Sequence, residues 1–93
     1  MTASVTLLDD AVWNEERACV EVTARVHGHG GARELPMAVS GEALERLVRT
    51  PGRPDPLRLL RDFERDICSA AARQLERDPP ELVVTARDLR AGA

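Results

Sequence analysis

Residues 18–27, ACVEVTARVH, decide the fold, because apolar and polar side chains alternate along them without a break. Val20, Val22, Ala24 and Val26 fall on one face, and charged or polar side chains fall on the other. A period of two is typical of a half-buried antiparallel strand. The glycine-rich residues 28–31 that follow predict a hairpin. Residues 33–40 are therefore expected to return as the partner strand, with Leu35, Met37 and Val39 inward and Pro36 marking an edge or a bulge.

Helix signals follow the hairpin. Ser40 is an N-cap residue for a helix over 42–49. Asp55 followed by Pro56 predicts the start of a second helix, which we expect to run unbroken to about Arg77 and to stop before Pro79-Pro80. Its apolar stripe contains Leu60, Phe63, Ile67 and Ala71, extended by Leu57 and Leu75. The loop over 50–54 separates the two helices.

The remaining segments are short. Residues 4–8 and 81–86 are β-prone, a single helical turn capped by Asp10 is expected around Trp13, and 90–93 is expected to be a frayed tail. The sequence therefore predicts one α+β domain over 1–93. It contains a small antiparallel sheet of about four strands, in the order β-β-β-α-α-β, with two helices covering one face.

Composition limits the possible partners. The net charge is −3, all thirteen basic residues are arginine, and aromatic residues make up 2% of the chain. This excludes a basic field over the whole surface for nucleic acid or anionic membrane. No signal-like N-terminus and no membrane-spanning apolar run are present, so we expect a cytoplasmic protein that does not enter a membrane. Cys19 and Cys68 are expected to be buried thiols, with a disulfide between them as the alternative.

Candidate chemical groups are sparse. His27 and His29 form a His-x-His pair, a weak metal candidate that lacks a third ligand nearby. Neither cysteine has a neighbouring base in the sequence, and no phosphate loop, dinucleotide fingerprint or nucleophile elbow is present. We therefore predict no catalytic residue, no bound metal and no cofactor.

Two groups of residues suggest binding instead. Trp13 and Arg17 are four residues apart and are a candidate platform for a ligand or partner, although such a tryptophan more often closes one end of a small sheet. The outer face of the second helix leans basic. Its arginines are candidate phosphate contacts: Arg58, Arg61, Arg65 and Arg73.

The chain resembles the bacterial domain-of-unknown-function family numbered fourteen eighty-eight. The resemblance rests on Trp13, Arg17, the Ser40-Gly41-Glu42-Ala43-Leu44 motif, Ile67, Ala71, Thr85 and Asp88-Leu89. Glu64 and Leu60 depart from the family pattern, where a basic and an aromatic residue are usual. The resemblance implies an α+β fold and a bacterial origin, and it implies no activity.

Three functions follow from these patterns. The preferred hypothesis is a non-enzymatic interaction or regulatory accessory module that binds an unknown protein partner. The first alternative is weak nucleic-acid association through the arginine-rich helix face. The second is a small enzyme whose site is assembled from residues distant in sequence. We also expect a homodimer, with its contact on an edge strand (residues 4–8 or 81–86) or around Trp13.

Overall fold

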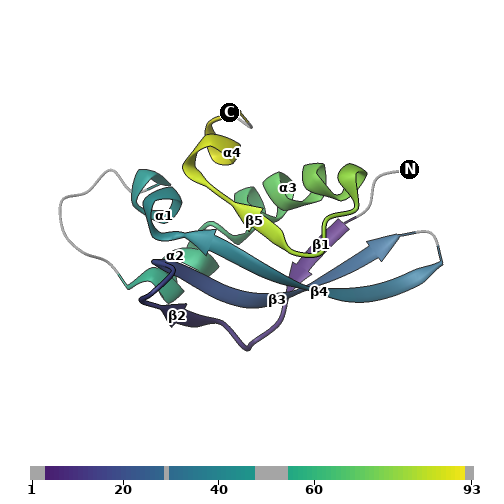
Figure 1. Cartoon of the computed structure of the whole chain (residues 1–93), viewed down its shortest axis with the longest axis horizontal. Helices are drawn as coiled ribbons and strands as arrows, with labels where there is room; N and C mark the ends of the chain where they lie inside the picture. The colour runs from purple at the N-terminus through teal and green to yellow at the C-terminus, as the bar shows by residue number, and fades with distance from the viewer. Residues whose placement is uncertain (1–3, 29, 48–54, 92–93) are drawn as a thin grey trace.

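The computed structural model describes residues 4–28, 30–47 and 55–91. Its strands are β1 (Ser4–Leu7), β2 (Val12–Asn14), β3 (Cys19–Gly28), β4 (Gly31–Ser40) and β5 (Leu82–Val84). Its helices are α1 (Gly41–Leu47), α2 (Pro56–Asp62), α3 (Glu64–Gln74), the 3-10 turn η1 (Leu75–Arg77) and α4 (Ala86–Ala91). Figure 1 shows these elements along the chain.

The strands form one sheet in the order β1-β3-β4-β5, and β2 pairs with β3 along the same edge as β1. The pairings of β1, β2 and β4 with β3 are antiparallel, and the β3–β4 pairing confirms the predicted hairpin. β5 joins the sheet as predicted, but it runs parallel to β4. The sheet is therefore mixed, and the prediction of an antiparallel sheet is wrong at this strand. The intervening helices carry the chain back to the same end of the sheet, as a parallel connection requires.

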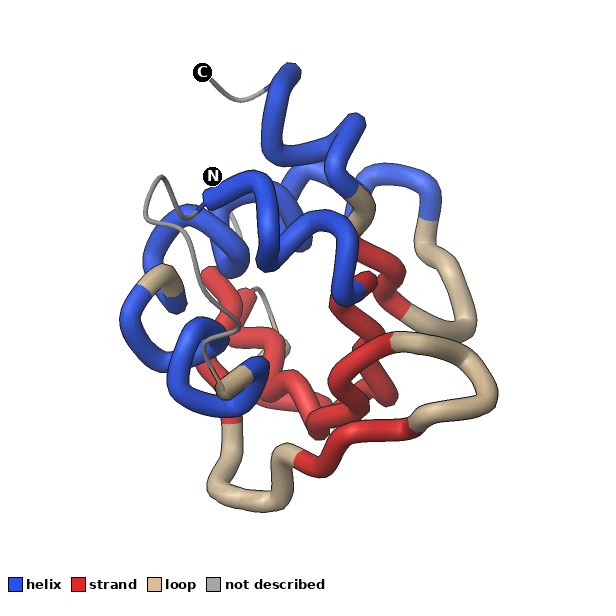
Figure 2. Tube along the Cα trace, turned by 90° about the vertical axis from the view of Figure 1, so that its left-hand side faces the viewer, coloured by secondary structure: helices blue, strands red, loops and turns tan. Residues whose placement is uncertain are grey.

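Helices gather on one side of the curved sheet, as Figure 2 shows. The side chains between the two layers form the core. From the sheet it takes Val20, Val22, Ala24, Val26, Met37, Val39 and Leu82, and from the helices it takes Leu44, Leu60, Ile67 and Ala71. The predicted inward faces of β3 and of the second helical region are thus confirmed, and so is the α+β fold with a small sheet.

The first correction concerns Trp13. Residues 12–14 form strand β2 in place of the predicted helical turn, with Trp13 opposite Val20. Asp10 caps no helix, because its carboxylate accepts hydrogen bonds from the backbone amide (2.9 Å) and the hydroxyl of Thr23. Asp10 therefore satisfies the edge of β3 at a point that neither β1 nor β2 covers.

The second correction concerns the long helix. Its start is confirmed, because the Asp55 carboxylate accepts from the Leu57 amide at 3.0 Å, and the chain leaves the helical region at Asp78, before Pro79. It is interrupted at Phe63, however, whose backbone leaves helical geometry at φ −114° and ψ 23°. α2 and α3 are consequently separate segments. The Ile67 amide still donates to the Phe63 carbonyl at 3.1 Å, so the interruption is local.

Ser40 caps α1 as predicted, since its hydroxyl accepts from the Ala43 amide at 3.0 Å. The predicted end of that helix and the loop over 50–54 lie outside the described residues. The C-terminal prediction is wrong: β5 ends at Val84, and residues 86–91, including part of the expected frayed tail, form α4. Thr85 and Asp88 explain this helix. The Asp88 carboxylate accepts from the Thr85 amide (2.8 Å) and hydroxyl (2.9 Å), which is the reciprocal half of a capping box.

Candidate functional site

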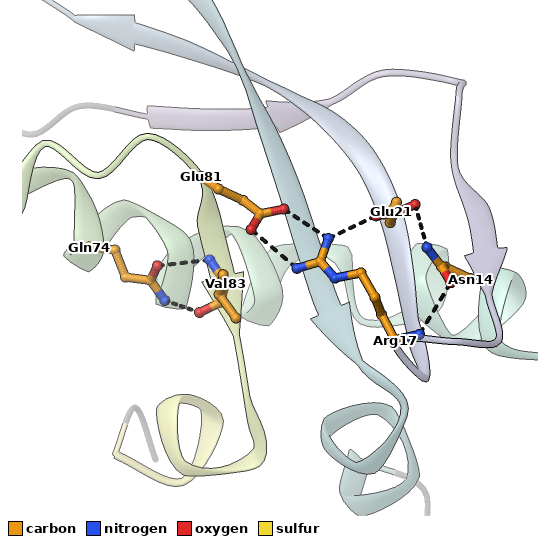
Figure 3. Close-up of polar contacts among 6 residues, drawn as sticks. All are labelled: Asn14, Arg17, Glu21, Gln74, Glu81 and Val83. Carbon is orange, nitrogen blue, oxygen red and sulfur yellow. Dashed lines mark hydrogen bonds and ion pairs between the residues drawn. The ribbon is translucent and has the colours of Figure 1, made fainter.

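The helix-free face of the sheet carries a polar cluster of Asn14, Arg17, Glu21 and Glu81, called the Arg17 cluster below (Figure 3). One Arg17 guanidinium nitrogen donates to Glu21 at 2.8 Å and to Glu81 at 3.1 Å, and the other donates to Glu81 at 3.2 Å. Asn14 donates to the second oxygen of Glu21 at 3.1 Å. The cluster joins the turn before β3 to the residue before β5.

The Arg17 cluster combines one guanidinium with two carboxylates. Hydrogen bonds from Asn14 and Arg17 lower the pKa of Glu21, and those to Glu81 and Glu21 raise the pKa of Arg17. Because Arg17 already pairs with two carboxylates, it has little capacity left for a ligand. The side chains are partly exposed and solvent screens them, so we interpret the cluster as a surface clasp between segments.

The structure places the two residues of the predicted Trp13–Arg17 platform on opposite faces of the sheet. Directly opposed residues share a face, so Trp13 points to the helix-covered side with Val20, whereas the Arg17 guanidinium lies with Glu21. The Trp13 ring packs at the start of α1, where a side chain on Gly41 would meet its Cη2 atom at 2.9 Å. The Gly41 amide donates to the Ala18 carbonyl at 2.8 Å.

The arginines predicted for the helix face are mostly engaged. Arg58 lies 3.8 Å from Asp62, and Arg61 pairs with Glu64 at 2.8 Å and donates to the Leu8 carbonyl at 2.6 Å. Arg73 donates to the Asp88 carbonyl at 3.1 Å. Arg65 alone of the four has no hydrogen-bond or ion-pair partner within the described part of the chain. The four arginines therefore do not form one unpaired basic surface.

Neither thiol is activated. Both cysteines are free, Cys19 being buried and Cys68 half-buried, so the disulfide alternative is not formed. Burial raises the pKa of the Cys19 thiol, against a smaller opposing effect of Arg17. Burial, with the nearby Glu64 carboxylate, raises the pKa of Cys68 to about 11. Thiols in such environments are neutral at pH 7, whereas a nucleophilic cysteine needs a lowered pKa.

The metal candidates are His27, whose ring contacts the Thr6 hydroxyl at 3.3 Å on the exposed surface, and His29, which lies outside the described residues. Over residues 4–28, 30–47 and 55–91, no group of three or more His, Cys, Asp or Glu side chains is placed to hold a metal ion. Within the same ranges, no helix is long and apolar enough to cross a membrane.

A shallow groove of about 400 Å³ lies between β1 and α3, and sequence reasoning missed it. Five α3 positions form one wall and the start of β1 forms the other. Its lining residues are Ser4, Val5, Glu64, Arg65, Cys68, Ser69 and Ala72. The positions 64, 65, 68, 69 and 72 follow helical spacing, which marks one face of α3, but the sequence contains no signal that β1 lies beside that face.

Among the comparisons with known proteins, the search of solved structures gives a match. No protein-family model matches the chain, and no curated protein matches it either. A crystal structure of a protein of unknown function of the DUF1488 family, from the bacterium Shewanella loihica PV-4, aligns with a TM-score of 0.68. The alignment covers 90% of this chain and 94% of that one at 19% identity, and at this identity it shows the fold alone. The chain therefore resembles a DUF1488-family protein in its fold, which confirms the resemblance inferred from the sequence.

Proposed function

We propose that this chain is a non-enzymatic, cytoplasmic interaction module that binds a protein partner along the edge of β1. The observation that carries the proposal is that the two outer edges of the sheet differ. β1 lies at one end of the strand order and β5 at the other. An uncovered strand edge offers a row of backbone donors and acceptors to another chain.

The edge of β1 is open. The Leu8 amide donates to the Thr23 carbonyl at 3.0 Å, so the Leu8 amide is directed toward β3. Backbone groups alternate in direction along an antiparallel strand, so Thr6 and Ser4 also direct theirs toward β3. Val5 and Leu7 direct theirs away from the sheet. Among the described residues, no hydrogen bond reaches these outward groups of Val5 or Leu7.

The edge of β5 is closed. The Gln74 side chain donates to the Val83 carbonyl, and its amide oxygen accepts from the Val83 amide at 3.0 Å (Figure 3). A primary amide presents a donor and an acceptor side by side, as a neighbouring strand does. A partner that adds a strand to this sheet therefore meets a filled position at β5 and an unfilled one at β1.

The other functions considered have less support. Arg58 and Arg61 already pair with carboxylates, which lowers the number of phosphate contacts available for nucleic acid. The raised pKa values of Cys19 and Cys68 disfavour thiol chemistry. The free thiols agree with a reducing compartment, which supports the cytoplasmic part of the proposal.

Affinity capture from a bacterial lysate with three forms of the protein tests the proposal. Val5→Pro removes the outward amide of β1, and its control Val5→Ala truncates the same side chain but keeps that amide. A protein captured by wild type and by Val5→Ala, and lost with Val5→Pro, supports binding at this edge. A partner retained by Val5→Pro, or the absence of any specific partner, contradicts the proposal. Circular dichroism must first establish that each variant is folded.

A further inference from the structure

We infer that the segment bound beside β1 is an extended peptide that places an apolar side chain over Cys68 and Ala72 and an acidic side chain against Arg65. This inference rests on the proposed function and names the chemistry of the partner. The groove between β1 and α3 carries it, together with the unpaired backbone groups of Val5 and Leu7 and the charges along the α3 wall.

The dimensions of the two walls suit a short strand. The α3 residues that line the groove run from 64 to 72, which is about 12 Å at 1.5 Å per residue. The four residues of β1 extend about 13 Å. An added strand of about four residues therefore spans the groove, with hydrogen bonds to β1 on one side and side-chain contacts with α3 on the other. Recognition of a peptide between an edge strand and a helix is an established mode of strand addition.

The base of the groove is apolar. Val5 is 8% exposed and belongs to the core, and the half-buried Cys68 and Ala72 stand opposite it. The Cys68 thiol is uncharged at pH 7 because its pKa is raised to about 11, so it acts here as a small apolar surface. Side chains of an added strand alternate between its two faces, so every second one is directed to this surface.

The charges along the groove favour an acidic side chain in the bound peptide. Glu64, the acidic residue in the groove, is held by Arg61 at 2.8 Å. Arg65 is exposed and pairs with no carboxylate in the part of the chain that the structure describes. The unneutralised charge along the groove is thus positive. Arg65 stands on the helical wall, where a side chain of the added strand reaches it. We therefore assign the acidic group to a side chain of the peptide and not to its terminal carboxylate.

A second copy of the chain fits this groove less well. Paired with itself, β1 would offer the side chains of Ser4, Val5, Thr6 and Leu7. None of these is acidic, so in a β1–β1 pair the added strand offers Arg65 no carboxylate. We therefore assign the groove to a different polypeptide and treat self-pairing as an outcome that the experiment must distinguish.

The test is selection from a displayed library of random seven-residue segments, flanked on both sides so that no free carboxylate is present. Wild type and the control variant Arg58→Gln should enrich alternating sequences with an apolar residue and an acid at fixed spacing. Arg65→Gln should keep the apolar pattern and lose the acid. The most enriched peptide, made with blocked ends, should shift the amide NMR signals of Val5, Leu7 and residues 64–72. It should bind wild type roughly two- to five-fold more tightly than its glutamine analogue, the range for one exposed ion pair.

Each other outcome overturns the inference in a recognisable way. Enrichment at β1 without an acid preference refutes the role of Arg65 and leaves the proposed function intact. Equal enrichment by Val5→Pro, or no enrichment by wild type, refutes peptide binding at this groove, and the lysate capture then judges the proposed function separately. A doubled mass in light scattering that Val5→Pro abolishes shows that a second copy occupies the edge.

Discussion

The side-chain amide of Gln74 should be required both for stability and for keeping the molecule from associating through β5. Replacing it by alanine removes the two hydrogen bonds that close the edge at Val83. A typical intramolecular hydrogen bond contributes about 0.5–1.5 kcal/mol net. Val83 is 39% exposed, so water partly replaces the lost partners, and we expect a loss in the lower half of the sum, about 1–2 kcal/mol.

Chemical denaturation and thermal melting followed by circular dichroism measure this loss. A domain of this size should melt roughly 5–15 °C lower for that change in free energy. Glu76→Ala is the matched control, because it makes the same truncation in the adjoining turn, and Glu76 is exposed. Light scattering should in addition show concentration-dependent association of Gln74→Ala, since the edge of β5 then offers a free donor and acceptor.

Gln74→Glu sharpens the test. At pH 7 the carboxylate can accept from the Val83 amide, but it cannot donate to the Val83 carbonyl and repels it. Folding therefore disfavours the charged form and raises the pKa of the new carboxyl. The destabilisation relative to wild type should shrink as the pH falls through this raised pKa and be gone below the unfolded value of about 4. Equal stabilities of Gln74→Ala and Glu76→Ala, with no change in mass, would refute the role assigned to Gln74.

Three further predictions follow from single contacts. Gly41→Ala should destabilise the fold by about 1–3 kcal/mol and change the fluorescence of Trp13, the only tryptophan, because the new methyl group meets its ring at 2.9 Å. Alkylation of Cys68 at pH 8 should be more than about a hundredfold slower than that of a free thiol, rising as the pH approaches its pKa of about 11. The hydrogen bonds from Thr23 lower the pKa of Asp10. The ionised Asp10 carboxylate therefore stabilises the fold above about pH 4, and this stabilisation is lost as the pH falls through the folded pKa. Asp10→Asn should flatten that part of a pH–stability curve.

The sequence predicts an element correctly where the signal is local, as in an alternating strand or a residue that caps the helix beside it. The alternation over 18–27, the Ser40 cap and the Asp55-Pro56 start each predict an element that the structure contains. The capping box of Thr85 and Asp88 has the same local character, and its short helix was missed because the residues beyond it resembled a tail. Thr85 and Asp88 belong to the resemblance to the DUF1488 family, as do Trp13 and Gly41. Each of the four has a structural role here.

Tertiary relations were harder to predict. Asp10 was expected to cap a helix, since an aspartate before an apolar residue is a common helix start. Its carboxylate instead bonds Thr23, thirteen residues away, because neither β1 nor β2 covers the edge of β3 at this point. The parallel direction of β5 likewise depends on the path through α1, α2 and α3, and no residue of 82–84 encodes it.

The availability of a strand edge is the clearest case of a property that sequence alone misjudges. Residues 4–8 and 81–86 look equally unprotected, because neither contains proline and both carry little charge. In the structure their edges are opposite in character, and the difference lies in Gln74, nine positions before Val83 and on a different element. When a side chain from another element covers a strand edge, the sequence of the strand itself does not show it. Because this amide fills β5 and no described group fills β1, any strand added to this sheet, from a partner or from a second copy, is directed to the same edge, beside the groove that contains Arg65.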